Sequence, residues 1–279
     1  MRIPSILLIA GVLFILNLLA FSALRLPTDG SSNFQSRSSW DSFDPNLVKQ
    51  LHNIDDLIRM ANQAVAPNLR KTLTYYDTVN NLVQRRFYHG YSYYSNDENS
   101  LSFLCGKLLR SDFSAIVIPD DIMKHPMAAC SQQAIVMMEV FRRQGIAYRK
   151  VAFDHHFAIE GFINGRWYFF DPNKEPIFVN GRQSIQQLIE NNTFTSCYVN
   201  SGYSLTSFNS ANTPPRLGTV NEEFAKRVKY LHKTGFMIHR FATVWMIGFA
   251  ILFCELVWRL GIRINYRPPL VILVRQKKQ

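Results

Sequence analysis

The dipeptide Asn164-Gly165 constrains the fold of this 279-residue chain more than any other short feature. It separates two runs rich in aromatic and β-branched residues, HHFAIEGFI at 155–163 and RWYFFDP at 166–172. Asn-Gly between two such runs is the strongest short-range signal for a two-residue hairpin, because both turn residues need a positive φ. We therefore expect antiparallel strands in which residue 163 lies opposite 166, residue 160 opposite 169 and residue 158 opposite 171.

This register selects one of two adjacent histidines. Side chains alternate between the faces of a strand, so His155 and His156 point to opposite sides. His156 becomes a diagonal neighbour of Asp171 on the same face, where backbones are separated by about 7–8 Å and long side chains meet. His155 lies on the other face. The pattern therefore pairs His156, and not His155, with Asp171.

The segment CSQQAIVMMEVFRRQG at 130–145 is typical of a single helix. Ala134, Met137 and Phe141 follow Cys130 at helical spacing, which places Cys130 on the buried face at the start of the helix. Gly145 is a C-terminal stop signal. A strand, IAYRKVAF at 146–153, is expected between this helix and the hairpin.

Cysteine, histidine and aspartate in this arrangement can perform nucleophilic catalysis. An aspartate holds the histidine in one tautomer, and a helix N-terminus with a nearby histidine lowers a thiol pKa. Cys130, His156 and Asp171 are thus the candidate catalytic residues. Two structural alternatives stay open: a cysteine on an apolar helix face is often a small core residue, and His–Asp pairs across hairpins are often structural.

The same residues resemble the core of the transglutaminase-like superfamily. In that family a Cys opens a helix, a G-I-x-x-R-x-V strand follows, and then come H-A-W-x-E, a turn with Gly, a Trp and Asp-Pro. The matching positions here are Cys130, Gly145, Ile146, Arg149, Val151, His156, Glu160, Gly165, Trp167, Asp171 and Pro172. The resemblance covers about residues 68–176 and is specific over 128–172. Ala128 and Ala158 depart from it, where the family commonly has a Gly and an aromatic residue.

The resemblance implies an α+β, papain-like core in which the Cys helix packs on an antiparallel sheet. It also implies amide or peptide chemistry through a thioester on Cys130, with hydrolysis by a protease or amidase favoured over acyl transfer in crosslinking. The Cys130 backbone N–H would donate to the oxyanion hole. No cofactor or metal is expected, since zinc-type spacings and a phosphate-binding Gly-rich loop are missing. Expected substrates are proteins, peptides or peptidoglycan stems.

Two apolar segments, 3–24 and 241–260, are candidates for transmembrane helices. The first is expected to be an uncleaved signal anchor, with a cleaved signal peptide as the alternative. Residues 25–236 hold 23 Lys and Arg against 19 Asp and Glu, so most of the net charge of +11 lies at the ends of the chain. This distribution argues against a nucleic-acid-binding face. It favours a bacterial inner (plasma) membrane protein, possible envelope protein partners, and a domain outside the cytoplasm.

The domain organisation expected is an anchor at 1–24, a linker at 25–44, the transglutaminase-like domain at 45–236, a transmembrane helix at 237–261 and a basic cytoplasmic tail at 262–279. Further helices are expected at 45–63, 68–88, 99–109 and 183–191, and a polar loop at 196–220. Cys105 and Cys197 could form a disulfide in an oxidising compartment, which the sequence leaves open. Arg149 is expected to pair with Glu160.

Two other functions remain open from the sequence. One is a non-catalytic envelope module that uses the same fold to bind or assemble a partner. The other is a membrane scaffold organised by the two apolar segments. An intact set of Cys130, His156 and Asp171 favours the enzyme, because a scaffold has no chemical need for all three.

Overall fold

The computed structural model describes residues 42–174, 176–199 and 214–265. The chain divides into two compact units. One comprises Thr28–Gly235, and the other combines Met1–Pro27 with Phe236–Gln279. The three candidate catalytic residues all belong to the Thr28–Gly235 unit, which mixes helices with an antiparallel sheet.

The first helices of this unit are shorter than the sequence predicted. The helix expected at 45–63 is interrupted, giving α2 (Pro45–Gln50) and α3 (Ile54–Ala64). The break has a local cause: Asn53 adopts an extended backbone, and its side chain accepts a hydrogen bond of 2.8 Å from the Asp56 N–H. Such an N-cap starts a new helix and ends the old one.

Three further α-helices precede Cys130. The predicted helix at 68–88 is a 3₁₀ turn (Pro67–Leu69) followed by α4 (Leu73–Arg86). The helix expected at 99–109 is α5 (Ser100–Leu108), capped by the Asn99 side chain. A second 3₁₀ turn (Ser111–Phe113) and a short helix, α6 (Pro119–Ile122), come next.

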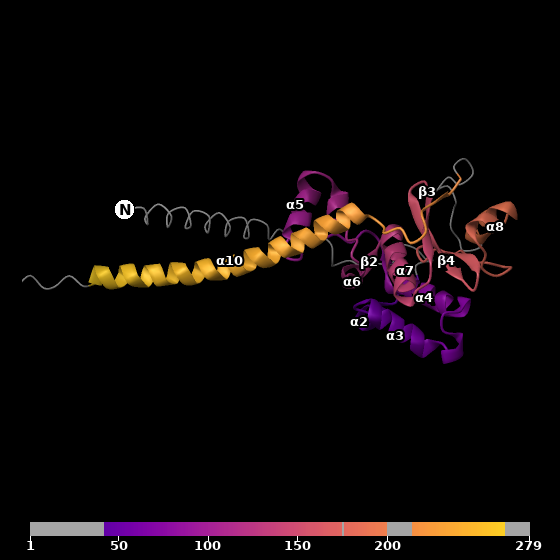
Figure 1. The fold of residues 1–279 in the computed structure, drawn as a ribbon, viewed down its shortest axis with the longest axis horizontal. Coiled ribbons are helices and arrows are strands. Elements are labelled where there is room, and N and C mark those ends of the chain that lie inside the picture. The colour runs from indigo at the N-terminus through magenta and orange to yellow at the C-terminus, as the bar shows by residue number, and fades with distance from the viewer. Residues whose placement is uncertain (1–41, 175, 200–213, 266–279) are drawn as a thin grey trace, which may run out of the picture. The chain divides into compact units, whose positions relative to one another are not determined.

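The main sheet has four antiparallel strands in the order β5-β4-β3-β6. Figure 1 labels two of them, β3 and β4. Its strands are β3 (Tyr148–Phe153), β4 (His156–Ile163), β5 (Arg166–Phe170) and the short β6 (Arg216–Leu217). A separate parallel pair joins β1 (Tyr88–His89) to β2 (Met127–Ala128), just before the cysteine-bearing helix α7 (Cys130–Gln144).

The hairpin register predicted from Asn164-Gly165 is confirmed. Ile163 lies opposite Arg166 and Glu160 opposite Phe169. Asn164 and Gly165 have φ values of 49° and 80°, the positive values that a two-residue turn of this kind requires. The two strands therefore present the faces that the sequence assigned to them.

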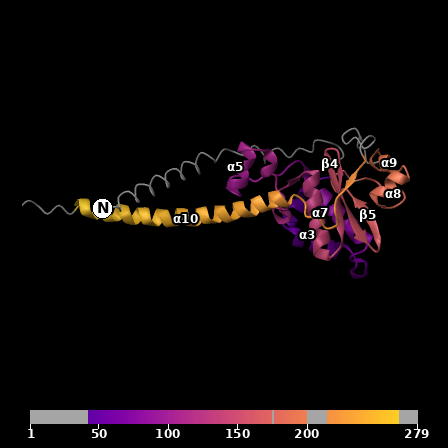
Figure 2. The same cartoon turned by 45° about the horizontal axis from the view of Figure 1, so that its top comes forward.

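Helices cover both faces of the sheet (Figures 1 and 2). On one face lies α7, and the Phe141 ring of this helix sits where a side chain at Gly161 would otherwise be. The other face packs against α8 (Ile185–Glu190) and α9 (Phe194–Val199) through a buried apolar cluster that includes Phe153, Ala158 and Phe169. Part of the predicted loop at 196–220 therefore has secondary structure, since α9 extends into it as far as Val199 and β6 lies within it.

The predicted pair of transmembrane helices is not supported. The segment 3–24 lies outside the described residues. The segment 241–260 belongs to α10 (Lys226–Asn265), yet no helix in the described parts of the chain is long and apolar enough to cross a membrane.

The fold class that placed the core between two transmembrane helices is therefore wrong in that respect. The location outside the cytoplasm stays a prediction.

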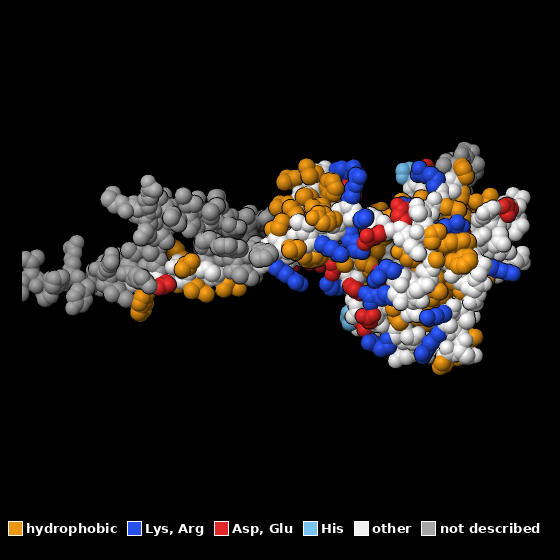
Figure 3. All heavy atoms as spheres, in the orientation of Figure 1, with side chains coloured by type: hydrophobic (Ala, Val, Ile, Leu, Met, Phe, Trp, Pro, Cys, Tyr) orange, Lys and Arg blue, Asp and Glu red, His pale blue; other side chains and the backbone are white. Residues whose placement is uncertain are grey.

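Among the exposed apolar side chains of the Thr28–Gly235 unit, several lie near α5. Figure 3 shows hydrophobic side chains gathered over α5. Leu108 and Leu109 at the end of that helix are 77% and 70% exposed.

The thiols of Cys105 in α5 and Cys197 in α9 are both free, so the disulfide left open by the sequence does not form in this structure.

Candidate active site

Cys130 occupies the first position of α7, as the sequence predicted. Ala134, Met137 and Phe141, which follow it at helical spacing, are buried. The helix ends at Gly145, which has the left-handed φ of 71° typical of a C-terminal cap. Because the first N–H groups of a helix have no partner within it, the Cys130 backbone N–H lies at the positive end of the helix dipole.

His156 is the first residue of β4. The turn before it, Asp154-His155, gives His155 a φ of 58° and leaves its side chain 85% exposed. His156 is only 3% exposed, and its ring stacks on Phe153 with centroids 5.9 Å apart. The structure therefore separates the two adjacent histidines: one lies in the protein interior and the other in a solvent-exposed turn.

Asp171 follows directly after β5 and is completely buried. Its Oδ2 lies 2.6 Å from Nε2 of His156, the contact that the hairpin register predicted. Its Oδ1 accepts hydrogen bonds from the backbone N–H groups of Asn173 and Lys174, at 3.2 and 3.1 Å. Since both oxygens are engaged, the carboxylate is fixed in position against the imidazole.

The Cys130 thiol lies close enough to the His156 side chain and to the backbone N–H of Phe157 for both to lower its pKa. Asp171 occupies Nε2 of His156, which leaves Nδ1 as the ring nitrogen for the thiol. The chain thus brings all three sequence-predicted residues into one connected arrangement of sulfur, imidazole and carboxylate.

This arrangement favours the charged forms of all three groups. Burial opposes ionisation of Cys130, but the hydrogen bond and charge of His156 and the Phe157 N–H outweigh it, so the thiol pKa is lowered from 9.0. Burial would likewise lower the His156 pKa, yet the Asp171 and Cys130 charges raise it to about 9. Burial would raise the Asp171 pKa, and the charge and hydrogen bond of His156 lower it instead.

Two residues near the site, Tyr198 and Lys174, were not predicted from the sequence. The Tyr198 hydroxyl, from α9, donates a hydrogen bond of 2.9 Å to Oδ2 of Asp171. Lys174 lies close enough for the charges of Asp171 and Cys130 to act on it, although burial dominates and lowers its pKa. The only sequence signal for Lys174 was its position three residues after Asp171, and nothing distinguished Tyr198 within its polar segment.

The residues after Cys130 have a supporting role. Gln132 is buried, and its side-chain amide donates to the carbonyl oxygens of Ser92 and Ile116 while its Oε1 accepts from the N–H groups of Ser92 and Ala129. With its donors and acceptor engaged, Gln132 ties the start of α7 to the preceding segments and is not free to contact a substrate.

The predicted pair of Arg149 and Glu160 is confirmed, with Nε of Arg149 2.7 Å from Oε2 of Glu160. The other oxygen of Glu160 accepts a hydrogen bond of 2.7 Å from the Ile185 N–H at the start of α8. This buried carboxylate therefore joins β3, β4 and α8 behind the site. Within the described residues, no three His, Cys, Asp or Glu side chains cluster as a metal site would require.

Comparison with known proteins gives no relative. No protein-family model, curated protein or solved structure matches the chain. What can be said of function therefore rests on the geometry of Cys130, His156 and Asp171. That geometry supplies a nucleophile, a proton carrier and an orienting carboxylate, the three parts that a covalent acyl-transfer mechanism needs.

Proposed function

We propose that the protein is a transglutaminase-like cysteine enzyme that acts on amide or peptide bonds, with hydrolysis as its main reaction. The observation that carries the proposal is the arrangement of a thiol, an imidazole and a buried carboxylate: His156 is near enough to Cys130 to lower its pKa, and Nε2 of His156 lies 2.6 Å from Asp171. The placement of Cys130 at the start of α7 supports it further.

In the proposed reaction the Cys130 thiolate attacks the carbonyl carbon of the amide. Its backbone N–H, at the start of α7, is placed to donate to the oxygen that becomes negative. His156 carries the proton and gives it to the leaving amine as the C–N bond breaks, which leaves a thioester on Cys130. His156 then accepts a proton from water, whose oxygen attacks the thioester and releases the acid and the thiolate.

Asp171 has a positioning and electrostatic part in these steps. It holds the imidazole through Nε2, so that Nδ1 faces the thiol, and its charge stabilises the imidazolium. An amine in place of water would give crosslinking. Hydrolysis is proposed because no acceptor-amine site is apparent in the sequence.

The proposal is tested with the full chain and an activated ester, p-nitrophenyl acetate. We expect a burst of p-nitrophenol and an acetyl thioester on Cys130 after acid quench, detected by mass spectrometry of the peptides. Cys130→Ala abolishes both. Cys105→Ala, which changes a partly exposed cysteine in α5, leaves both unchanged.

The result that overturns the proposal is equally concrete. If Cys130 forms no thioester and reacts with iodoacetamide no faster than Cys105 at neutral pH, the thiol is not activated. The non-catalytic binding module then replaces the enzyme as the function of this fold.

A further inference from the structure

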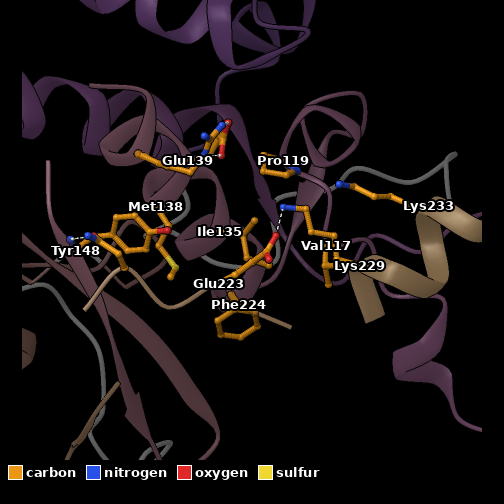
Figure 4. A pocket seen from close by; sticks show the side chains of 12 residues that line it. Val117, Pro119, Ile135, Met138, Glu139, Tyr148, Glu223, Phe224, Lys229 and Lys233 are labelled. Atoms are coloured by element: carbon orange, nitrogen blue, oxygen red, sulfur yellow. Dashed lines mark hydrogen bonds and ion pairs between the residues drawn. The ribbon is translucent and has the colours of Figure 1, made fainter. Parts of the chain in front are cut away.

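A cavity of about 460 Å³ lies beside α7, and none of the three candidate catalytic residues lines it (Figure 4). Three separate stretches of chain form its walls. They are the segment before α6, the second half of α7 with the start of β3, and the segment that leads from β6 into the first turns of α10. Its volume falls within the range of small-molecule sites, about 300–1,000 Å³.

Part of the wall is apolar. Val117, Ile135 and Met138 are buried and present hydrocarbon to the cavity, and the aromatic rings of Tyr148 and Phe224 flank them. A ligand can bury an apolar or aromatic body against this wall. Such burial supplies the larger part of the affinity in small-molecule sites, with a few polar groups fixing the orientation.

The charged part of the wall has one cation more than it has anions. The carboxylate of Glu139 is bonded to Arg142 at 2.7 Å, and that of Glu223 to Lys229 at 2.5 Å. Each carboxylate thus has its own cation in the lining. The fifth charge is Lys233, which extends from α10 toward the cavity (Figure 4).

Among the described residues, Lys233 makes no hydrogen bond and no ion pair, so its ammonium is available to a ligand at the rim. The hydrogen bond from Lys229 and the charges of Lys229 and Lys233 lower the pKa of Glu223. Glu223 therefore stays ionised at neutral pH, and it already has Lys229 as its hydrogen-bonded partner. The surplus is a single positive charge, which matches a monoanion better than a doubly charged phosphate.

We propose that this cavity is a binding site for a monoanionic carboxylate attached to an apolar or aromatic group. The carboxylate meets Lys233, and the apolar group lies against Ile135, Met138 and Phe224. Both small organic acids and the carboxyl end of a peptide with an apolar last residue have this chemistry.

The cavity also lies next to β4, the strand that carries His156. The Phe224 ring packs edge-on against Phe157 with centroids 5.3 Å apart, and the Phe157 N–H is near enough to Cys130 to help lower the pKa of its thiol. The proposal does not depend on catalysis, since none of its contacts involves the thiol. It can therefore be tested in Cys130→Ala, where any turnover of the probe is absent.

The test uses the full chain with ¹³C-methyl-labelled methionine and a titration with 4-phenylbutyrate followed by NMR. The Met138 methyl signal is assigned with Met138→Leu. We expect it to shift in a saturable manner, with a dissociation constant on the order of 1 mM for a ligand of this size. Met127, which lies in β2 and does not line the cavity, serves as the internal reference and does not shift.

Charge is tested on both partners. The neutral analogue 4-phenylbutanol and the variant Lys233→Glu each weaken binding by about tenfold or more, as expected when an anion loses or repels its partner. Lys49→Glu, which reverses an exposed charge on α2, stays within about twofold of the unchanged protein. Butyrate, which keeps the carboxylate but lacks the ring, does not saturate.

A parallel titration with N-acetylphenylalanine and its amide separates the two sources of the ligand. Binding of N-acetylphenylalanine but not of the amide assigns the site to peptide carboxyl ends, and binding of phenylbutyrate alone assigns it to small acids. Two results overturn the proposal. One is an unchanged Met138 signal with every probe, and the other is equal binding of the alcohol and the acid that Lys233→Glu does not alter.

Discussion

The Tyr198 hydroxyl donates a hydrogen bond to the same oxygen of Asp171, Oδ2, that contacts His156. The two donors reach this oxygen from two different elements, α9 and β4. Asp171 is completely buried, and such a carboxylate stays ionised only when donors and a cation compensate for its lost hydration. Tyr198 is therefore a positioning residue for the proposed catalytic pair of His156 and Asp171, acting through Asp171.

Tyr198→Phe removes this donor and should lower the free energy of unfolding by about 1.5–3 kcal/mol, the range for a hydrogen bond to a charged group. The Tyr198 hydrogen bond is one of the causes that hold the Asp171 pKa down, so its loss raises that pKa. A carboxyl group whose pKa is lowered in the folded protein stabilises that protein, and this stabilisation is lost as the pH falls through the folded-state pKa. The acid unfolding midpoint, followed by circular dichroism, therefore moves to higher pH.

Tyr230→Phe is the matched control, because that tyrosine is 75% exposed on α10. It should leave the acid midpoint in place. An unchanged midpoint in Tyr198→Phe as well would show that the hydroxyl does not support Asp171.

The reactivity of Cys130 should depend on His156. A thiol with the ordinary pKa of 9.0 is about 1% ionised at pH 7, whereas His156 lowers the pKa of Cys130. His156→Gln removes the imidazolium charge and should slow iodoacetamide alkylation of Cys130 at pH 7 by about tenfold or more. The rate should then rise with pH as for a free thiol. Peptide mass spectrometry over a pH series measures both effects.

The neighbouring histidine provides the control for that experiment. His155 lies in an exposed turn with a φ of 58°, a conformation that asparagine tolerates well. His155→Asn should leave the rate of Cys130 alkylation unchanged. Equal slowing by both variants would contradict the assignment of His156 as the catalytic histidine.

The pairing of His156 with Asp171 could be predicted from sequence because it depends on local geometry. Asn164-Gly165 determines the turn, the turn determines the register, and the register determines which histidine shares a face with the aspartate. The limits of α7 were predictable for a similar reason, since Gly145 takes the left-handed conformation that ends a helix. Short-range steric rules were sufficient in both cases.

The contacts that the sequence did not reveal are between distant segments. Tyr198 lies 27 residues after Asp171 on a six-residue helix, and its role exists only once α9 packs on the sheet. Gln132 has a polar side chain but is buried, because four backbone groups satisfy its amide. The spanning helix predicted at 241–260 is a different case, since no helix among the described residues is long and apolar enough to cross a membrane.

The ion pair of His156 and Asp171 should make stability depend on pH in a defined window. The folded-state pKa of His156 is raised to about 9 from 6.5, so its contribution is complete below about pH 6.5 and is lost as the pH rises through about 9. Asp171→Asn removes the negative partner. The unchanged protein should be more stable than Asp171→Asn at both pH values. We expect this difference in the free energy of unfolding to be larger at pH 6 than at pH 9.5, by about 1–3 kcal/mol.

Urea unfolding of the full chain at the two pH values measures this difference. Asp154→Asn, which neutralises an exposed carboxylate in the turn before His156, is the control and should show little pH dependence. A difference for Asp171→Asn that is the same at both pH values would contradict the charged pair.

The buried carboxylate of Glu160 should contribute far more to stability than a surface carboxylate in the same sheet region. Glu160 is completely buried between Arg149 and the Ile185 N–H, at 2.7 Å from each. Glu160→Gln keeps an acceptor for Ile185 but leaves the Arg149 charge, which is 18% exposed, without its partner. We expect a loss of about 3 kcal/mol in the free energy of unfolding, as for other broken buried pairs.

Glu222→Gln removes the carboxylate of a surface ion pair, in which Oε2 of Glu222 lies 3.2 Å from Nζ of Lys150. The Glu222 side chain is 43% exposed and that of Lys150 is 30% exposed. Its cost should be below about 1 kcal/mol. Since Glu160 joins β4 to the start of α8, its loss should also increase amide hydrogen exchange in both elements, whereas Glu222→Gln should not. Similar losses for the two variants would show that Glu160 does not hold these elements together.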